Sequence, residues 1–432
     1  MKFKKVLVLV LFLSLSWGCG YINEKPIPVS EKRGTPEHTP VWNNSGWVIA
    51  RGSIHNHTTF SDGCRTPEDL IQQARNEGIA VLSITDHREG RTCVGKDQKI
   101  CVNMGGFDSK KVGSKKYFEY MKRLASETES PVVLVGFEIG PYMWNEGYFP
   151  WLTLKATHWH FTVYKIDTPE LFSRMPAPWG IAPEPQPDPG LKPYRDFVNY
   201  VIENGGIVFQ AHPESGNYER YYNLVYLLSG APTHLTEKLL NLTGVAVVPS
   251  GLNEVAQPSG EWDRANAQYL AGIREKPLWG TGDADFHCPD PGESLRNGTT
   301  LFYLKELSQE EVFNAMLSGR MVALMGEEFQ EVFVSEFSAG DGKAGSEKIM
   351  LGQNVTISAA PVVRFSLNKD VPGQESRLIR NGKIIYSTGA SGFEFRDEES
   401  GLKKAPIFYR VEVIAGDGQA HLFTNPIFVS WR

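Results

Sequence analysis

Two histidines separated by one residue follow an apolar run near the start of the chain. His55 and His57 stand in the segment Ile-His-Asn-His-Thr-Thr-Phe-Ser-Asp-Gly (54–63), and Asp62 and His87 follow soon after. Side chains at positions i and i+2 of an extended strand point to the same face, so the two imidazoles can hold one ion together. Imidazole and carboxylate ligands side by side suit zinc, manganese or iron better than calcium or magnesium. The segment therefore predicts such a metal site at the end of a strand.

Other potential ligands also stand where apolar runs end. A single histidine is more often an ordinary surface or core residue, so the prediction rests on the whole set. Glu138 closes the run 132–137, and a carboxylate that ends a buried strand needs a partner, which a position between two cations would supply. Asp285 and His287 form a second pair two positions apart. The histidines that end or closely follow such runs are His55, His87, His160, His212 and His287.

Length and charge limit the classes of function. The 432 residues, of which 41% are hydrophobic and 22% charged, indicate a globular protein of one to three domains. The net charge of −6 provides no basic surface for long nucleic acid. A small nucleotide substrate stays open.

The N-terminus resembles a bacterial export signal. Lys2, Lys4 and Lys5 precede an apolar stretch at 6–15 that is too short to span a bilayer. Residues 15–19, Leu-Ser-Trp-Gly-Cys, resemble a lipobox, although Ser16 stands where leucine is usual. We expect a signal peptide at 1–18, lipidation at Cys19 and a flexible tether at 19–45, which would anchor the protein in the periplasm or cell envelope. Cleavage by the ordinary signal peptidase is the alternative.

Four cysteines remain after Cys19, and an exported chain can pair them in three ways. Cys64 lies two residues after Asp62, and Cys288 directly follows His287. If Asp62 and His287 serve one metal, these cysteines are close. We predict the disulfides Cys64–Cys288 and Cys93–Cys101, with four buried free thiols as the alternative.

Strands and helices alternate from Trp47 to about Leu324. Thr66 and Pro67 begin the first helix, and Gly78 ends it. This alternation predicts parallel strands with helical crossovers, and seven or eight units favour a closed barrel at 46–328 with its active groups at the carboxyl ends of the strands. Strands are expected near 79–85, 132–137, 157–164, 207–211, 244–248, 278–283 and 299–304, and helices near 114–127, 193–203, 234–241, 261–275 and 308–318.

Two insertions and a second domain complete the expected organisation. The aromatic segment 141–151 and the proline-rich segment 176–193 either wall the pocket or pack on the barrel surface. Residues 329–432 show strand-like runs, turn pairs such as Asn381-Gly382 and no helical pattern, which predicts a small antiparallel β-sandwich. We expect this accessory domain to carry no chemistry.

The ligand motifs resemble those of the polymerase-and-histidinol-phosphatase (PHP) family of metal-dependent hydrolases. The resemblance covers roughly 47–325 and keeps the family's motif order. Thr-Asn-Pro-Ile at 424–427 also resembles the end of the carbaryl-hydrolase-like branch. The matching motifs are His-Asn-His-Thr-x-x-Ser-Asp-Gly (55–63), Thr-Asp-His (85–87), Gly-Phe-Glu-Ile (136–139), His-Phe-Thr-Val (160–163), Ala-His-Pro (211–213) and Asp-x-His (285–287).

This resemblance implies an α/β fold, a distorted (β/α)7 TIM-like barrel, and two to three divalent ions of zinc, manganese or iron. A water held by the metals would be the nucleophile, with Glu138 and Asp285 as the catalytic carboxylates. Carried over by motif, the three ligand sets are His55, His57, Glu138 and Asp285; Glu138, His160 and His212; and Asp62, His87 and His287.

Some positions stay ambiguous. Asp283 is a conceivable ligand beside Asp285, and His158 shares a strand face with His160. Asp86 is expected to orient an imidazole. Arg88 could clamp a substrate phosphate or lie solvated on the surface.

The resulting hypothesis is an exported phosphoesterase that acts on a small-molecule ester. A carboxylic ester or carbamate hydrolase with the same site is one alternative. A binding lipoprotein without catalysis is the other.

Overall fold

The computed structural model describes residues 41–88, 91–94, 100–103, 105–108, 112–147, 151–176, 188, 190–221, 225–289, 293–342 and 347–432. Cys19, the signal peptide and most of the tether lie outside these residues. No helix in the described part of the chain has the length and apolar character needed to cross a membrane.

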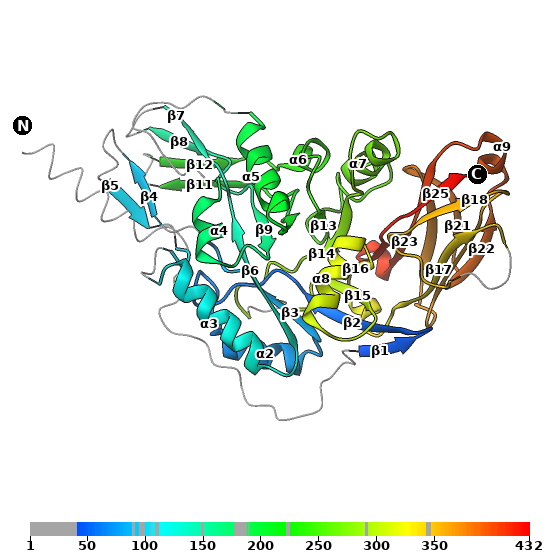
Figure 1. Ribbon diagram of the computed structural model, residues 1–432, viewed down its shortest axis with the longest axis horizontal. Helices are drawn as coiled ribbons and strands as arrows, with labels where there is room; N and C mark the ends of the chain where they lie inside the picture. The colour runs from blue at the N-terminus through cyan, green and yellow to red at the C-terminus, as the bar shows by residue number, and fades with distance from the viewer. Residues whose placement is uncertain are drawn as a thin grey trace, which may run out of the picture.

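A curved sheet forms the N-terminal part of the molecule (Figure 1). Four pairs in it are parallel: β2–β3, β3–β6, β10–β13 and β13–β14. Its strand order is β14 (Trp279–Gly282), β13 (Gly244–Val248), β10 (Ile207–Gln210), β9 (Phe161–Tyr164), β6 (Val132–Ile139), β3 (Val81–Ile84), β2 (Trp47–Ser53), β15 (Thr299–Leu304) and β16 (Met321–Met325).

Helices connect these strands close to the predicted positions, and the α/β class is confirmed. The Thr66 hydroxyl accepts a hydrogen bond from the Asp69 backbone N–H at 3.1 Å, and Pro67 occupies the first turn, so the first helix begins as its capping residues indicate. The connecting helices are α2 (Pro67–Asn76), α3 (Ser114–Glu127), α4 (Pro169–Arg174), α5 (Lys192–Glu203), α6 (Thr233–Lys238), α7 (Glu261–Leu270) and α8 (Gln309–Ser318).

The expectation of parallel strands throughout is wrong at β9 and β15. Strand β9 pairs antiparallel with both β6 and β10. Between β6 and β9 the described residues form β7 (Trp144–Glu146) and β8 (Leu152–Lys155) and no helix. Parallel neighbours are usually joined by a helical crossover, and the described part of this segment forms strands instead, so the chain returns in the opposite direction. Strand β15 is antiparallel to β2 and β16, and the count of seven barrel units stays a prediction.

The aromatic insertion contributes to a small separate sheet. Its strand order is β11 (Asn217–Tyr221), β12 (Val225–Ser229), β8 and β7. A further hairpin pairs β4 (Arg91–Val94) with β5 (Ile100–Asn103). Most of the proline-rich segment 176–193 lies outside the described residues.

The C-terminal region continues the large sheet. Strand β16 pairs with β24 (Ala420–Thr424), which leads to β23 (Ile407–Ala415), β20 (Glu375–Arg380) and β21 (Lys383–Thr388). Strand β25 (Ile427–Trp431) pairs with β23 and with β18 (Asn354–Ile357). A separate three-stranded sheet contains β17 (Val334–Gly340), β19 (Val362–Leu367) and β22 (Gly392–Arg396). The β-sandwich and the boundary at 328/329 stay predictions.

Two local features of the C-terminal region can be compared with the predictions from the sequence. Asn381 and Gly382 have φ of 47° and 80° and form the predicted hairpin turn between β20 and β21. The expectation that no helix follows residue 329 is wrong, because α9 (Glu398–Lys403) is a short helix. The Asp397 side chain accepts the Ser400 backbone N–H and so caps a helix too short to show a periodic pattern.

Buried polar contacts join the C-terminal strands to the barrel. Asn425, from the Thr-Asn-Pro-Ile segment, accepts the Gly280 N–H at 2.7 Å and donates to the carbonyls of Gly280 and Met321. It therefore links β14 to β16. Arg410 on β23 forms a two-pronged ion pair with Asp263 on α7 at 2.6 and 2.8 Å, and both side chains are buried.

Replacing Arg410 with methionine is expected to lower the free energy of unfolding by about 3–5 kcal/mol, because Asp263 would be left buried without its cation. Urea unfolding measures this loss. Arg364→Met is the matched control, since Arg364 pairs with the exposed Glu394 and such a surface pair contributes about 0–1 kcal/mol. Equal stability of the two variants would contradict the prediction.

Candidate metal centre

The nine predicted ligands converge at one end of the curved sheet. His55, His57 and Asp62 follow β2, and His87 follows β3. The remaining five come from β6, from the residue before β9 and from the residues after β10 and β14: Glu138, His160, His212, Asp285 and His287. Donor atoms of eight of these residues form three groups, in each of which the atoms lie within 4.8 Å of one another and could hold a metal ion. His212 belongs to none of the three groups.

The first group contains His55, His57, Glu138 and Asp285. The two histidine Nε2 atoms are 3.1 Å apart. Each lies 3.3 Å from Glu138 Oε2 and 3.4 Å from Asp285 Oδ1. For metal–ligand bonds of about 2.0–2.1 Å, the edge of a tetrahedron is roughly 3.3–3.4 Å. The four donors therefore have the spacing of a tetrahedral metal site.

The second group contains Glu138, His160 and His87, and His212 lies beside it. His160 Nδ1 and His212 Nε2 each lie 3.1 Å from Glu138 Oε1 and 3.2 Å from one another. His87 Nδ1 approaches Glu138 Oε2 at 3.0 Å. The two oxygens of Glu138 thus face two different donor groups.

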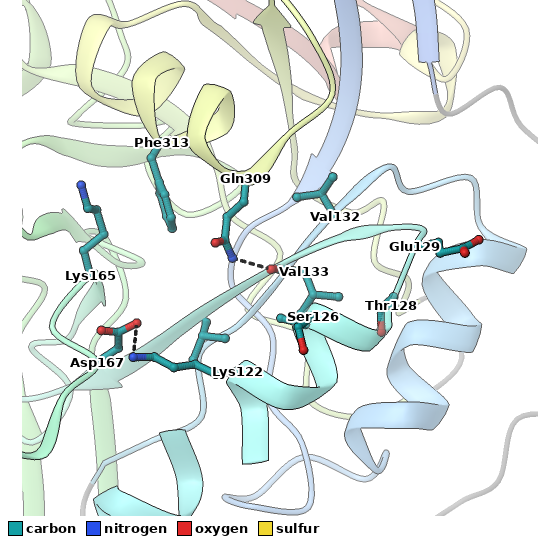
Figure 2. A pocket seen from close by; sticks show the side chains of 12 residues that line it. Lys122, Ser126, Thr128, Glu129, Val132, Val133, Lys165, Asp167, Gln309 and Phe313 are labelled. Carbon is teal, nitrogen blue, oxygen red and sulfur yellow. Dashed lines mark hydrogen bonds and ion pairs between the residues drawn. The ribbon is translucent and has the colours of Figure 1, made fainter. Parts of the chain in front are cut away.

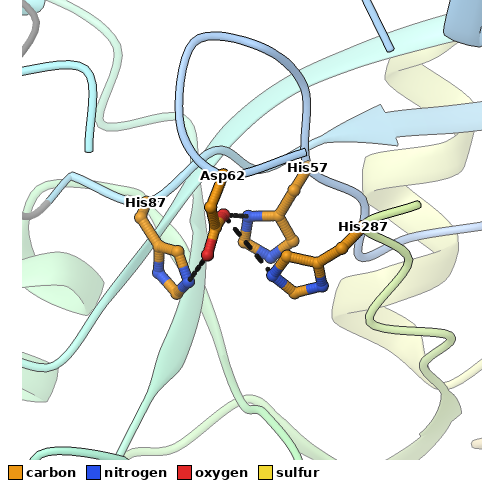
Figure 3. A group of neighbouring side chains, drawn as sticks. All are labelled: His57, Asp62, His87 and His287. Carbon is orange, nitrogen blue, oxygen red and sulfur yellow. Dashed lines mark ion pairs between the residues drawn. The ribbon is translucent and has the colours of Figure 1, made fainter. Parts of the chain in front are cut away.

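The third group contains Asp62, His57, His87 and His287 (Figure 3), and its carboxylate is more open to solvent than Glu138. Asp62 Oδ1 lies 3.4 Å from His287 Nε2 and 3.6 Å from His57 Nδ1, and Asp62 Oδ2 lies 3.7 Å from His87 Nε2. Asp62 and His287 are about one third exposed, whereas Glu138 is fully buried. The structure adds His57 to the three ligands carried over by motif.

Unpartnered oxygens show that the donors fit cations. Glu138 Oε2 and Asp285 Oδ1 are buried atoms that accept no hydrogen bond. Leaving an ionised carboxylate oxygen in this condition is costly, and a cation would offset the cost. The mixed imidazole and carboxylate set suits zinc, manganese or iron.

The pKa shifts of the two carboxylates are also consistent with cation binding. Burial alone would raise the pKa of Glu138, but His55, His160 and His87 outweigh it and hold the pKa well below its usual value. Burial would likewise raise the pKa of Asp285, and His55 and His287 lower it strongly. Both carboxylates therefore stay ionised, as metal ligands must.

Residues behind the ligands orient them. The Ser61 hydroxyl donates to Asp86 Oδ1 at 2.7 Å and lies 3.2 Å from His57 Nδ1. Asp86 therefore acts on an imidazole through Ser61 and does not touch the ring. Asp86 also accepts the backbone N–H groups of Thr58 and Ser61. The roles of Ser61 and Thr58 were not predicted, although both residues stand inside the first motif.

Gly63 explains one further position of that motif. A Cβ there would lie 2.3 Å from the His57 carbonyl oxygen, so only glycine fits. The Gly63 N–H also donates to the Thr58 carbonyl at 3.0 Å. The tight turn carries Asp62 back toward His57.

The ambiguous residues take distinct places. The His158 ring lies 4.4 Å from that of His212, outside the three groups, and burial together with His160 and His212 lowers its pKa to about 3. Arg88 lies 5.0 Å from the centre of the Phe172 ring and 3.9 Å from Asp108. Asp283 Oδ1 lies 2.7 Å from His55 Nδ1, on the side of the ring that faces away from the first group.

Cysteines flank the third group. The structure contains a disulfide between Cys64 and Cys288, with Cα atoms 5.0 Å apart. Cys93 and Cys101 are opposite one another in the β4–β5 pair, and their side chains lie outside the described residues.

A separate cavity of about 440 Å³ lies at the other end of β6 (Figure 2). Val132 and Val133 line it at the start of that strand, whereas Glu138 is near its end. Lys122 pairs with Asp167 at 3.1 Å beside it. None of the nine ligands lines this cavity.

Comparisons with known proteins agree with the geometry. Error-prone DNA polymerases of Mycobacterium tuberculosis and Mycobacterium bovis are 36% identical over 63 residues, which is 14% of this chain and 6% of theirs. The 5'-3' exoribonuclease Rnm of Escherichia coli K12 is 53% identical over 34 residues, 8% of this chain and 12% of its own. The matches thus span a small part of these relatives.

Among solved structures, a two-domain protein from Bacteroides vulgatus, containing a predicted PHP-like metal-dependent phosphoesterase, has a TM-score of 0.41 and 14% identity, over 87% of this chain and 94% of its own. The family model of the PHP domain matches residues 53–232. These residues contain seven of the nine predicted donors. This part of the chain is therefore a PHP domain.

Proposed function

We propose that this chain is a metal-dependent hydrolase of a small phosphate ester. The observation that carries the proposal is the sharing of Glu138, whose two oxygens face two donor groups at 3.0–3.3 Å. Neighbouring cations that share a ligand are the arrangement used by phosphatases and nucleases. When bound, such cations lower the pKa of water and neutralise charge on the substrate oxygens.

The chain's own residues would divide the remaining work. Glu138, fully buried and ionised, holds the groups together. Asp62, Asp285 and His287 are each about one third exposed, so substrate and water reach the centre from their side. Asp285, about one third exposed beside the first group, is placed to receive the proton that an attacking water loses.

Two features support a small substrate. The net charge of −6 disfavours long nucleic acid. The Trp159 ring lies 5.3 Å from Tyr194 and 5.9 Å from Trp144, and Trp159 directly precedes His160 in the chain. The same aromatic residues, with Arg88 held beside Asp108, favour the second candidate, a carboxylic ester or carbamate hydrolase.

A substrate panel distinguishes the candidates. Protein loaded with zinc, manganese or iron is expected to hydrolyse p-nitrophenyl phosphate or bis-p-nitrophenyl phosphate. The exoribonuclease among the relatives is named for action on RNA, a phosphodiester, so the second compound is included. Hydrolysis of p-nitrophenyl acetate alone would favour the second candidate. Absence of turnover with every metal would favour a binding lipoprotein.

We also propose that the protein is exported and lipid-anchored at Cys19. The support is the lysine-rich start, the short apolar stretch and the lipobox-like sequence. Radiolabelled palmitate is expected to label the wild-type chain in bacterial cells, whereas Cys19→Ser should abolish the label. Equal labelling of Cys19→Ser would contradict the assignment.

A further inference from the structure

We propose that Asp283 is a positioning residue, whose single oxygen Oδ1 holds two of the four donors of the first group, His55 and Asp285. This inference rests on the proposed function and assigns a role to a residue outside the donor groups. Asp283 directly follows β14, and its backbone N–H donates to the Val248 carbonyl at 2.9 Å. Its side chain is 5% exposed, so the carboxylate is held inside the protein.

The first contact is with the His55 ring. Asp283 Oδ1 lies 2.7 Å from Nδ1, while Nε2 faces Glu138 and Asp285 on the opposite side. The oxygen lies outside ideal hydrogen-bond geometry for this nitrogen, and the attraction is mainly electrostatic. A carboxylate at this position favours the proton on Nδ1 and leaves the lone pair of Nε2 for a metal.

The second contact is with the backbone of Asp285. Its N–H donates to the same Asp283 Oδ1 at 3.2 Å, which closes a turn in which a side chain binds the backbone two residues on. Asp285 has a φ of 47°, in the left-handed region that non-glycine residues rarely adopt. The Asp283 contact stabilises this conformation, which brings Asp285 Oδ1 to 3.4 Å from both His55 and His57.

Two substitutions separate these contacts. Asp283→Ala removes both, whereas Asp283→Asn keeps an oxygen for the Asp285 N–H and loses the charge beside His55. Full-length protein stripped of metal is titrated with zinc against a chromophoric chelator, and with cobalt followed by visible absorption. Asp370→Ala is the matched control, since Asp370 is exposed in the loop between β19 and β20.

Asp283→Ala is expected to lower the affinity for one equivalent of zinc by about 10- to 100-fold, because the loss of partners behind metal ligands has an effect of this size. It should also change the visible absorption spectrum of the cobalt-loaded protein. Asp283→Asn should fall between Asp283→Ala and wild type, and it carries the test if the alanine variant does not fold. If the folded variants show the dissociation constants and cobalt spectra of the wild type, the role of Asp283 is disproved, and the proposed function is unaffected. A wild-type chain that binds neither ion would overturn the proposed function as well.

Discussion

Glu138→Gln is expected to lose the metal ions of the first and second donor groups and to abolish turnover. Glutamine keeps the shape of the side chain but replaces a negative oxygen with an amide that carries hydrogens. The Nε2 atoms of His55, His57 and His212 would then face a neutral group at 3.1–3.3 Å. We expect the loss of metal affinity to exceed the roughly 10- to 100-fold cost of losing a partner behind a ligand.

Elemental analysis of the purified variant measures the metal content directly, and the p-nitrophenyl panel measures turnover. Glu275→Gln is the matched control, because it makes the same chemical change at an exposed position. It should retain wild-type metal and rate. A Glu138→Gln variant with full metal content and an unchanged rate would disprove the bridging role.

The candidate site could be predicted because its ligands belong to the strand ends. His55, His57 and His87 follow buried strands whose apolar runs are visible in the sequence, and the carboxyl ends of parallel strands meet at one edge. The helices could also be predicted, because their signals are local in the sequence. Helix α3 covers the predicted range 114–127, and a Thr-Pro pair marks the start of α2.

The remainder depends on contacts that one sequence does not reveal. The direction of β9 is decided by pairing with β6 and β10, and its four residues carry no signal of orientation. The continuation of the sheet from β16 to β24 joins segments far apart in the chain. Asp283 and Asp285 are chemically alike, and only the spacing to His287 favoured Asp285 as the ligand. The contact of Asp283 with the far side of the His55 ring is a tertiary contact that spacing does not reveal.

The double variant Cys64→Ser/Cys288→Ser is expected to lose both stability and the third metal group. The disulfide joins residues 224 positions apart, and closing a loop of that length lowers the entropy of the unfolded chain by an amount worth about 5 kcal/mol. Its ends lie beside Asp62 and His287, whose donor atoms are 3.4 Å apart and about one third exposed. Without the bond, backbone hydrogen bonds join the two segments: the Cys64 N–H donates to the His287 carbonyl at 2.9 Å, the His57 N–H to the Phe286 carbonyl at 2.8 Å, and the Phe286 N–H to the His55 carbonyl at 3.2 Å.

Guanidinium unfolding and metal stoichiometry test the two parts separately. The stability should fall by several kcal/mol, and one metal equivalent should be lost while the groups around Glu138 keep theirs, because Glu138 is fully buried on β6, away from the two ends that the disulfide joins. Cys93→Ser/Cys101→Ser is the matched control, since it removes the other predicted pair at a distance of only eight residues along the chain, where loop closure contributes less. If the first variant unfolds like wild type and holds every metal, the disulfide does not support the third group. Loss of stability with full metal content would limit its role to the fold.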